Sequence, residues 1–337
     1  MSSLLNPPLR IGLVGLGLVG AYHRERMALR EDLRVVALYD SSAEVRQAFQ
    51  RGRERLHESW QGFLADPEID AVWIATPPAS HQKLAEEVLR SGKSVIIEPP
   101  LVLDSRDGER LIETLRKVGK TVVVAHTRRW DEDFQQVLGL VRAGTLGTVL
   151  SLRLTCWSYN PPHLRQRRSG ETSWRDLAET GGGILWELGS HFFDQLLELV
   201  PAAPKEVYAH ATAPSRSIDD GFVVLVRFPQ GVTATLDLSR AALAPINSGW
   251  EIAGASGAYA GGVLFTATPE GEVEDFPLAA PPAASDPFYT AVVDHLCSDG
   301  PNPAPACRSL QVVRLIDAVR HSAETGEPVQ LPVAQEN

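Results

Sequence analysis

Two side chains capable of acid–base chemistry stand four residues apart near the middle of the chain, at Glu187 and His191. A helix would present both on one face, because residues four apart are neighbours on a helix surface. A carboxylate beside an imidazole can fix its tautomer and raise its basicity. Such an imidazole could take the proton that an alcohol loses when it is oxidised. The simpler alternative is a histidine that Glu187 only caps inside a buried helix.

A glycine-rich turn near the amino terminus has the pattern of a dinucleotide site. Gly15, Gly17 and Gly20 follow a short apolar run and open a helix-like segment, with Leu18 and Val19 completing the turn. Glycines there permit a tight turn and let a pyrophosphate approach the backbone. The helix amino terminus supplies free N–H groups and a favourable dipole. The pattern therefore predicts that all five residues contact a dinucleotide cofactor.

An acidic residue at the expected distance strengthens this interpretation. Asp40 lies twenty residues after Gly20, at the end of the next strand-like run. A carboxylate there can accept hydrogen bonds from the adenosine ribose hydroxyls and would repel a 2′-phosphate. We therefore expect NAD rather than NADP, with Ser41 beside the ribose, while Ser42 and Arg46 leave NADP open. An ordinary turn followed by a solvated aspartate is the alternative that this context argues against.

The first 126 residues alternate between strand-like and helix-like segments, as a parallel sheet with helices on both faces requires. Runs such as 122–124 are apolar without alternation, as expected for strands buried on both faces. The sequence therefore predicts an α/β Rossmann domain with a doubly wound parallel sheet over residues 1–126. The expected strands are 10–14, 35–39, 71–75, 94–97 and 121–125, and the expected helices include 19–30, 82–90 and 107–118.

After about residue 145 the pattern changes to successive strand-like runs, at 149–156 and throughout 205–264, interrupted by a helix at 183–199. Consecutive strands joined by turns favour an antiparallel sheet. Residues 127–337 are therefore predicted to form an α+β domain with a largely antiparallel open sheet, which serves substrate binding and oligomerisation. A final helix at 309–324, with apolar residues spaced for one face, could pack back on the first domain.

The net charge and the cysteine content of the chain argue against several classes of binding partner. The net charge of −10 gives no basic footprint for nucleic acid or an anionic membrane surface. Three cysteines without a C-x-x-C pair argue against a disulfide framework or a structural zinc site, so no metal is expected. The amino terminus lacks the pattern of a signal peptide, and no apolar run approaches a membrane span. These features favour a cytoplasmic protein that acts on a small molecule.

Five short motifs are spread over nearly the full length of the chain, at 75–81, 98–100, 127–130, 181–194 and 315–326. Together they resemble the glucose–fructose oxidoreductase, inositol dehydrogenase and rhizopine-catabolism (Gfo/Idh/MocA) family of NAD(P)-dependent oxidoreductases. The resemblance implies hydride transfer between a nicotinamide cofactor and a sugar, polyol or related hydroxy compound. It also implies a homodimer or homotetramer that assembles through the open sheet.

The resemblance further implies roles for individual residues. His191 corresponds to the general base, and Glu187 stands where the family usually has Asp. For His81 the alternative is a helix-start histidine with no chemical role. The implied cofactor contacts are Thr76, Pro77, His81, Glu98 and Pro99, and the implied substrate contacts are Arg128, Trp174 and Arg175. Pocket shape would depend on the loop 157–175.

One position departs from the family pattern. The family carries a lysine that contacts both nicotinamide and substrate where this chain has Pro99, which has neither a charge nor a donor. We expect another cation to take over its role, with Arg128, Arg129, Arg175 and Lys83 as candidates. The departure leaves two alternatives open. One is a cofactor-binding sensor or regulatory protein without turnover, and the other is an enzyme that uses tightly bound NAD for oxidation–elimination on a glycoside.

Overall fold

The computed structural model describes residues 5–49, 52–160, 173–212, 218–279 and 286–332. The chain divides into two compact units, one formed by residues 1–126 with 284–313 and the other by residues 127–283 with 314–337. Segment 284–313, which the sequence analysis placed in the second domain, is grouped with the first unit. Its helix α9 (Pro287–Cys297) packs against β1, and Pro305 forms a bridge with Val123. Among the described residues, no helix combines the length and apolarity needed to span a bilayer.

The first unit is built on a parallel six-stranded sheet in the order β3-β2-β1-β4-β5-β6. Every residue of β4, β5 and β6 is buried, which explains why these runs are apolar without alternation. The doubly wound Rossmann fold predicted from the sequence is therefore confirmed. The strands are β1 (Leu9–Val14), β2 (Leu33–Tyr39), β3 (Arg55–Leu56), β4 (Ala71–Ile74), β5 (Ser94–Ile97) and β6 (Val122–Val124).

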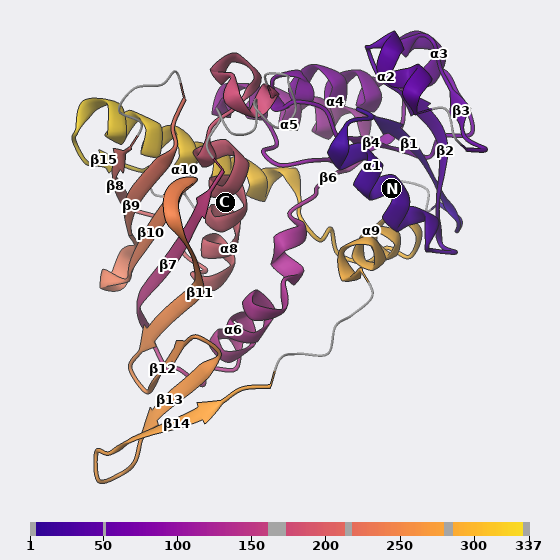
Figure 1. Ribbon diagram of the computed structural model, residues 1–337. Helices are drawn as coiled ribbons and strands as arrows, with labels where there is room; N and C mark the ends of the chain where they lie inside the picture. The colour runs from indigo at the N-terminus through magenta and orange to yellow at the C-terminus, as the bar shows by residue number, and fades with distance from the viewer. Residues whose placement is uncertain (1–4, 50–51, 161–172, 213–217, 280–285, 333–337) are drawn as a thin grey trace. The chain divides into compact units, whose positions relative to one another are not determined.

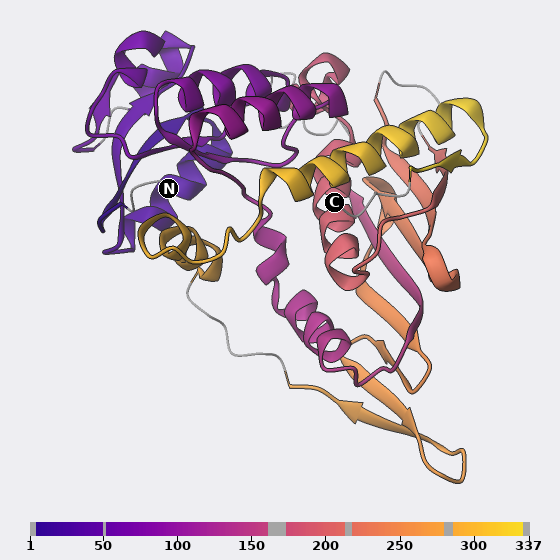
Figure 2. The same cartoon turned by 180° about the vertical axis from the view of Figure 1, so that it is seen from behind.

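Helices cover both faces of this sheet, with α4 and α5 on one face and α1 and α9 on the other (Figures 1 and 2). Helix α5 begins at a capping residue, Asp104, whose side chain accepts from the Arg106 N–H, and ends at Gly119 in the left-handed region. The helices are α1 (Leu18–Ala28), α2 (Ala43–Ala48), α3 (Trp60–Leu64), α4 (His81–Arg90) and α5 (Ser105–Val118).

The second unit holds a nine-stranded sheet in the order β14-β13-β12-β11-β7-β10-β9-β8-β15. Its described strand pairs are antiparallel except β10 with β7, so the predicted largely antiparallel sheet is confirmed. The strands are β7 (Val149–Tyr159), β8 (Glu206–Ala211), β9 (Gly221–Arg227), β10 (Thr233–Ser239), β11 (Ala241–Gly254), β12 (Gly257–Ala260), β13 (Val263–Ala267), β14 (Val273–Pro277) and β15 (Val329–Gln330).

Alternation along β9 shows how this sheet is used. Phe222, Val224 and Val226 are buried, whereas Val223 and Leu225 are exposed on the opposite face. Helices α6 (Glu132–Arg142), α8 (Ser190–Leu199) and α10 (Ala306–Thr325) accompany the sheet, and α10 is held to β8 where the Ser322 hydroxyl accepts from the Ala209 N–H. One face of the sheet is therefore packed and the other open.

The helix expected over 183–199 differs in one respect from the prediction. Residues Leu185–Gly189 form a π-helical turn, and the α-helix α8 begins only at Ser190. The Ser190 hydroxyl donates to the Trp186 carbonyl, which gives that carbonyl a side-chain partner in the widened turn. Single π turns of this kind occur frequently at functional sites, and this one directly precedes His191.

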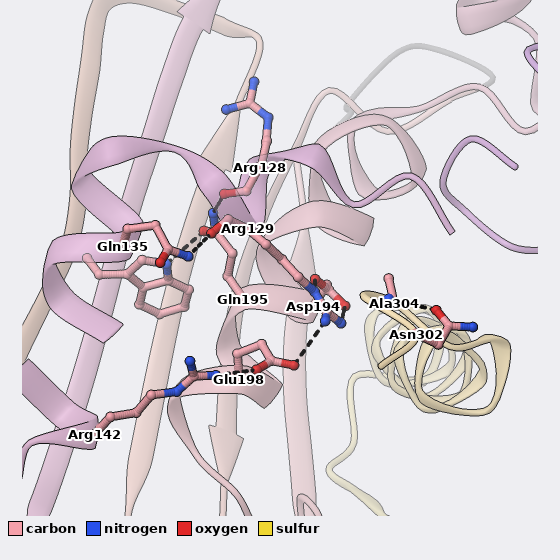
Figure 3. Close-up of polar contacts among 10 residues, drawn as sticks. Arg128, Arg129, Gln135, Arg142, Asp194, Gln195, Glu198, Asn302 and Ala304 are labelled. Atoms are coloured by element: carbon pink, nitrogen blue, oxygen red, sulfur yellow. Dashed lines mark hydrogen bonds and ion pairs between the residues drawn. The ribbon is translucent and has the colours of Figure 1, made fainter. Parts of the chain in front are cut away.

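A buried ion-pair cluster fixes the start of the second unit (Figure 3). Arg129 is 8% exposed and donates through two nitrogens to the Asp194 carboxylate at 2.6 Å, with Glu198 at 3.2 Å. Although burial lowers the pKa of Arg129, Asp194 and Glu198 raise it overall above its usual value. Gln195 donates to the Arg128 carbonyl at 2.6 Å and accepts from the Trp250 indole. The turn 127–130 is therefore tied to α8 at two successive residues.

Replacing Asp194 by asparagine should destabilise the second unit strongly. The change leaves a buried guanidinium without its bidentate anion, a loss that typically costs about 3–5 kcal/mol. Urea unfolding followed by fluorescence measures the difference from the parent protein. Arg142→Ala is the matched control, because this exposed arginine contacts Glu198 from the surface and should contribute less than about 1 kcal/mol. Equal midpoints for Asp194→Asn and the control would contradict the assigned role.

Candidate active site

The three glycines of the amino-terminal turn have different surroundings. Gly15 has φ +86°, and a Cβ there would lie 2.6 Å from the Ala75 carbonyl oxygen. A Cβ on Gly20 would lie 2.0 Å from the Gly15 oxygen, so α1 packs directly on the turn. A Cβ on Gly17, in contrast, would meet no described atom within 4 Å. The turn therefore has an open backbone surface at the start of α1, as a bound pyrophosphate requires.

Asp40 shapes this turn as well as standing at the expected ribose position. Its two carboxylate oxygens accept from the Leu16 N–H at 2.8 Å and from the Ser42 N–H at 2.9 Å. Arg46 donates to the carbonyl oxygens of Asp40 and Ser41, which orders the chain after β2. Each carboxylate oxygen has more than one lone pair, so these contacts leave acceptor capacity for ribose hydroxyls. In the turn itself, Leu18 is exposed and Val19 is half-buried.

The loops after β4 and β5 are joined through His81. This histidine is fully buried, with Nδ1 2.8 Å from the Pro100 carbonyl oxygen and Nε2 2.9 Å from the Thr76 carbonyl oxygen. Burial lowers the pKa of His81, while the hydrogen bonds to the two carbonyl oxygens act in the opposite direction. A neutral ring can donate to only one of these carbonyls, because it carries a single N–H. The contacts place His81 between the loops that carry Thr76, Pro77 and Pro99. These two hydrogen bonds join the loops that follow β4 and β5.

Glu98 ends a polar group that the sequence analysis missed. Its Oε1 accepts from the Trp73 indole and lies 2.9 Å from His23 Nε2, whose Nδ1 lies 2.7 Å from the Tyr289 hydroxyl. His23 belongs to the buried face of α1, at helical spacing from Gly20 and Met27. The sequence did offer one signal for this group. His23 is a polar residue on a helix face that is otherwise buried, and a buried polar group needs a hydrogen-bond partner. The contact to Tyr289 joins residues 266 positions apart, which local patterns cannot reveal.

These loops all follow the carboxyl ends of parallel strands. The glycine turn follows β1, Asp40 follows β2, Thr76 follows β4 and Glu98 follows β5. In an open α/β sheet, ligands bind at the carboxyl ends of the strands. They do so at the point where the segments that follow two neighbouring strands run to opposite faces of the sheet. The first unit therefore gathers the predicted cofactor residues along one edge.

In the second unit, Glu187 lies between two arginines. Its Oε1 is 3.1 Å from Arg175 Nε and its Oε2 is 3.2 Å from Arg240 Nη1. Arg240 is 2% exposed and also contacts the Asp220 carboxylate at 3.0 Å. The sequence analysis missed Arg240, although it continues the buried positions of β10, where a charged side chain is unusual. The Glu187 carboxylate is thus fixed by cations rather than free to reorient.

Asp219 anchors the π turn that leads to His191. Its Oδ2 accepts from the Leu185 N–H at 2.8 Å, and its carbonyl accepts from the Ile184 N–H. Gly183 has φ +111°, and a Cβ there would lie 2.2 Å from Asp219 Oδ1, so only glycine fits. Burial raises the pKa of Asp219. His191 itself is half-buried in the first turn of α8.

The candidate cations have different surroundings. Arg128 is partly exposed, with its guanidinium 5.7 Å from the centre of the Phe192 ring and 3.5 Å from Asp131. Figure 3 shows its side chain directed away from the Arg129 cluster. Arg175 stacks on Trp174 at 4.5 Å while it contacts Glu187. Lys83 is exposed on α4. In the loop 157–175, residues 161–172 lie outside the described part of the chain.

Two alanine substitutions should separate the structural glycine from the ligand-binding one. Gly20→Ala forces a Cβ against a backbone oxygen and should cost about 1–3 kcal/mol in thermal or urea unfolding. Gly17→Ala adds a methyl where the protein is open, so stability should change by less than about 0.5 kcal/mol. Affinity for the dinucleotide should then fall at least about tenfold in calorimetric titration, or about 1.4 kcal/mol. Unchanged affinity in Gly17→Ala would contradict the assigned pyrophosphate position.

Comparison with known proteins identifies the family to which both parts of the chain belong. Residues 9–126 match the model of an oxidoreductase family with an NAD-binding Rossmann fold, and residues 134–260 match the GFO/IDH/MocA C-terminal domain. Myo-inositol 2-dehydrogenase of Thermotoga maritima is 28% identical over 258 residues, which cover 74% of each chain.

Two solved structures extend the likeness to the whole fold. An NAD-binding protein from Listeria innocua is 29% identical with a TM-score of 0.85, covering 96% of this chain and 97% of that one. The WlbA dehydrogenase from Bordetella pertussis, solved with NADH and UDP-GlcNAcA, is 25% identical with a TM-score of 0.82, covering 96% and 99%. The chain therefore belongs to the GFO/IDH/MocA family of NAD-binding oxidoreductases, as its motifs indicated.

Proposed function

We propose that this protein is an NAD-dependent dehydrogenase of a sugar, polyol or related hydroxy compound, with His191 as the general base. The observation that carries the proposal is the position of His191. It stands in the first turn of α8, on a backbone anchored before it by Asp219 and after it by the Arg129–Asp194 pair. A base held on a fixed backbone suits proton transfer from a defined hydroxyl. Relatives include inositol dehydrogenases, which supports the substrate class.

The cofactor would be held by the first unit. The open backbone at Gly17 and the start of α1 fit a pyrophosphate, and Asp40 fits the adenosine ribose. When bound, NAD supplies the hydride-accepting group. The carboxylate of Asp40 favours NAD over NADP, because it would repel a 2′-phosphate. Ser41, Thr76 and Pro77 lie in loops at the same edge of the sheet and complete the proposed contacts.

The alcohol proton would pass to His191, while cationic side chains of the second unit hold the substrate oxygens. Glu187 would orient substrate hydroxyls by hydrogen bonds, since Arg175 and Arg240 fix its carboxylate. Arg128 is the best replacement for the absent lysine charge. Arg129 is held by Asp194 and Glu198, and Arg175 contacts Glu187 at 3.1 Å. Arg128 is partly exposed beside Phe192, and its contact with Asp131 is longer, at 3.5 Å. Trp174 would support Arg175 by stacking.

The open face of the second sheet suits assembly with further copies. Tyr208, Val223 and Leu225 are large apolar side chains exposed on neighbouring strands. Contiguous apolar surface of this kind marks interaction sites, and we propose a homodimer or homotetramer. A cytoplasmic location remains a prediction from sequence.

The first experiment is a substrate panel of inositols, sugars and sugar acids, with reduced nicotinamide followed by absorbance. His191→Ala should lower kcat by about 10²–10⁴-fold, because a positioned base contributes this much, while affinity for NAD stays unchanged. Glu274→Gln is a suitable comparison on the same unit, because Glu274 is an exposed carboxylate of β14 outside the proposed proton path. Full turnover by His191→Ala would exclude it as the base. Retained NAD affinity with no reduction of any compound by the parent protein would favour a sensor or internally recycled NAD.

The role of Arg128 is tested separately. Arg128→Met keeps the aliphatic contact with Phe192 but removes the charge, so kcat/KM should fall about 10²-fold or more on a substrate that wild-type protein turns over. Arg128→Lys should recover part of the loss. Arg153→Met provides a matched charge deletion on an exposed part of β7. Equal kcat/KM values for Arg128→Met and wild type would show that another group supplies the charge.

A further inference from the structure

Four side chains of the first unit form a buried hydrogen-bonded row that ends on Glu98. Tyr289 of α9 contacts His23 of α1, His23 contacts Glu98, and the indole of Trp73 donates to the same Glu98 oxygen. His23 and Tyr289 are 2% and 3% exposed, whereas the Glu98 side chain is 19% exposed. The Tyr289 end of the row is therefore buried, whereas the Glu98 carboxylate at the other end is partly exposed to solvent.

The order of donors along this row follows from the chemistry of its members. An ionised carboxylate only accepts hydrogen bonds, so the tautomer with a proton on His23 Nε2 satisfies the contact with Glu98. His23 Nδ1 then accepts from the Tyr289 hydroxyl. Burial raises the pKa of Tyr289 far above its usual value, so the hydroxyl keeps its proton. Hydrogen bonds donated to a carboxylate favour its charged form. The row thus supports a negative charge at Glu98.

The location of this charge matters for a dinucleotide. Asp40 follows β2 and would hold the adenosine side of a bound dinucleotide, while the glycine turn after β1 would hold its pyrophosphate. The residues that would hold the nicotinamide half are then those after the strands on the other side of β1, namely β4 and β5. Glu98 directly follows β5, and its neighbour Pro99 adds no positive charge.

We propose that Glu98 makes this site prefer the oxidised over the reduced cofactor. The inference rests on the proposed function, since it needs a nicotinamide dinucleotide in this site. The oxidised nicotinamide ring carries one positive charge and the reduced ring carries none, so a nearby carboxylate attracts only the oxidised form. At an effective dielectric constant of about 20, a unit charge within about 12 Å changes the ratio of the two affinities by about tenfold. For a two-electron couple that ratio equals about 30 mV.

The test measures the Kd of cofactor-free protein for NAD⁺ and for NADH separately, by calorimetry and by NADH fluorescence. Glu98→Gln keeps an oxygen for Trp73 and His23 to donate to but loses the charge. The ratio Kd(NADH)/Kd(NAD⁺) should therefore fall about tenfold. Pro99→Lys adds a positive charge beside Glu98 and should move the ratio in the same direction. Glu113→Gln removes an exposed carboxylate from α5 and should leave the ratio within twofold of wild type.

The ratio separates this proposal from a purely structural role or a ribose contact. Either of those would weaken both forms of the cofactor equally and leave the ratio unchanged, and this result would overturn the proposal. If Glu98→Gln does not fold, Glu98→Asn decides, because it removes the same charge with a smaller side chain and an unchanged ratio there has the same meaning. Wild-type protein that binds neither form would refute the proposed function itself. That outcome is distinct from tight binding of both forms with an insensitive ratio.

Discussion

The nucleotide-binding unit depends on one close backbone approach, that of α1 to the turn that precedes it. Gly20 lies so near the Gly15 carbonyl that no side-chain carbon fits between them. This contact fixes the position of the amino terminus of α1 at the edge of the sheet. One turn later in the helix, His23 packs against the ring of Trp73. Gly15 itself rests against the Ala75 carbonyl, which links the turn to the end of β4. The positions of the Asp40, Thr76 and Glu98 loops follow from the same packing.

In the second unit, buried ion pairs hold the backbone around the candidate catalytic residues in place. Arg129 and Asp194 join the entry turn to α8, and Arg240 joins Glu187 to the turn at Asp220. Removing one member of such a pair leaves a buried charge uncompensated, which is more costly than the pair is stabilising. The fold therefore strongly favours conformations in which both members of each buried ion pair stay in contact. A π turn, which is rare in proteins, can persist between such anchors.

Sequence patterns predicted those parts of the site whose arrangement depends on residues close together in the chain. Gly15, Gly20 and Asp40 are separated by one strand, one turn and one helix, so their spacing predicts their arrangement. The partners of Glu98 and Glu187 were not predictable in this way. Tyr289 reaches His23 from a segment that chain order placed in the other domain, and Arg240 reaches Glu187 across 53 residues. The π turn was not predicted either, because one of its anchors, the Asp219 carboxylate that accepts from the Leu185 N–H, lies 34 residues away in the chain.

Asp40 carries a consequence for attempts to change the cofactor. Its carboxylate is part of the wall of the glycine turn, since it accepts from the Leu16 N–H and also stands at the expected ribose position. Cofactor choice and turn geometry are therefore not separate properties of this chain. A substitution that removes the negative charge to admit a 2′-phosphate also releases a backbone donor inside the turn. Redesign toward NADP would have to supply a new acceptor for that amide, or the affinity gained at the ribose would be offset by a looser pyrophosphate cradle.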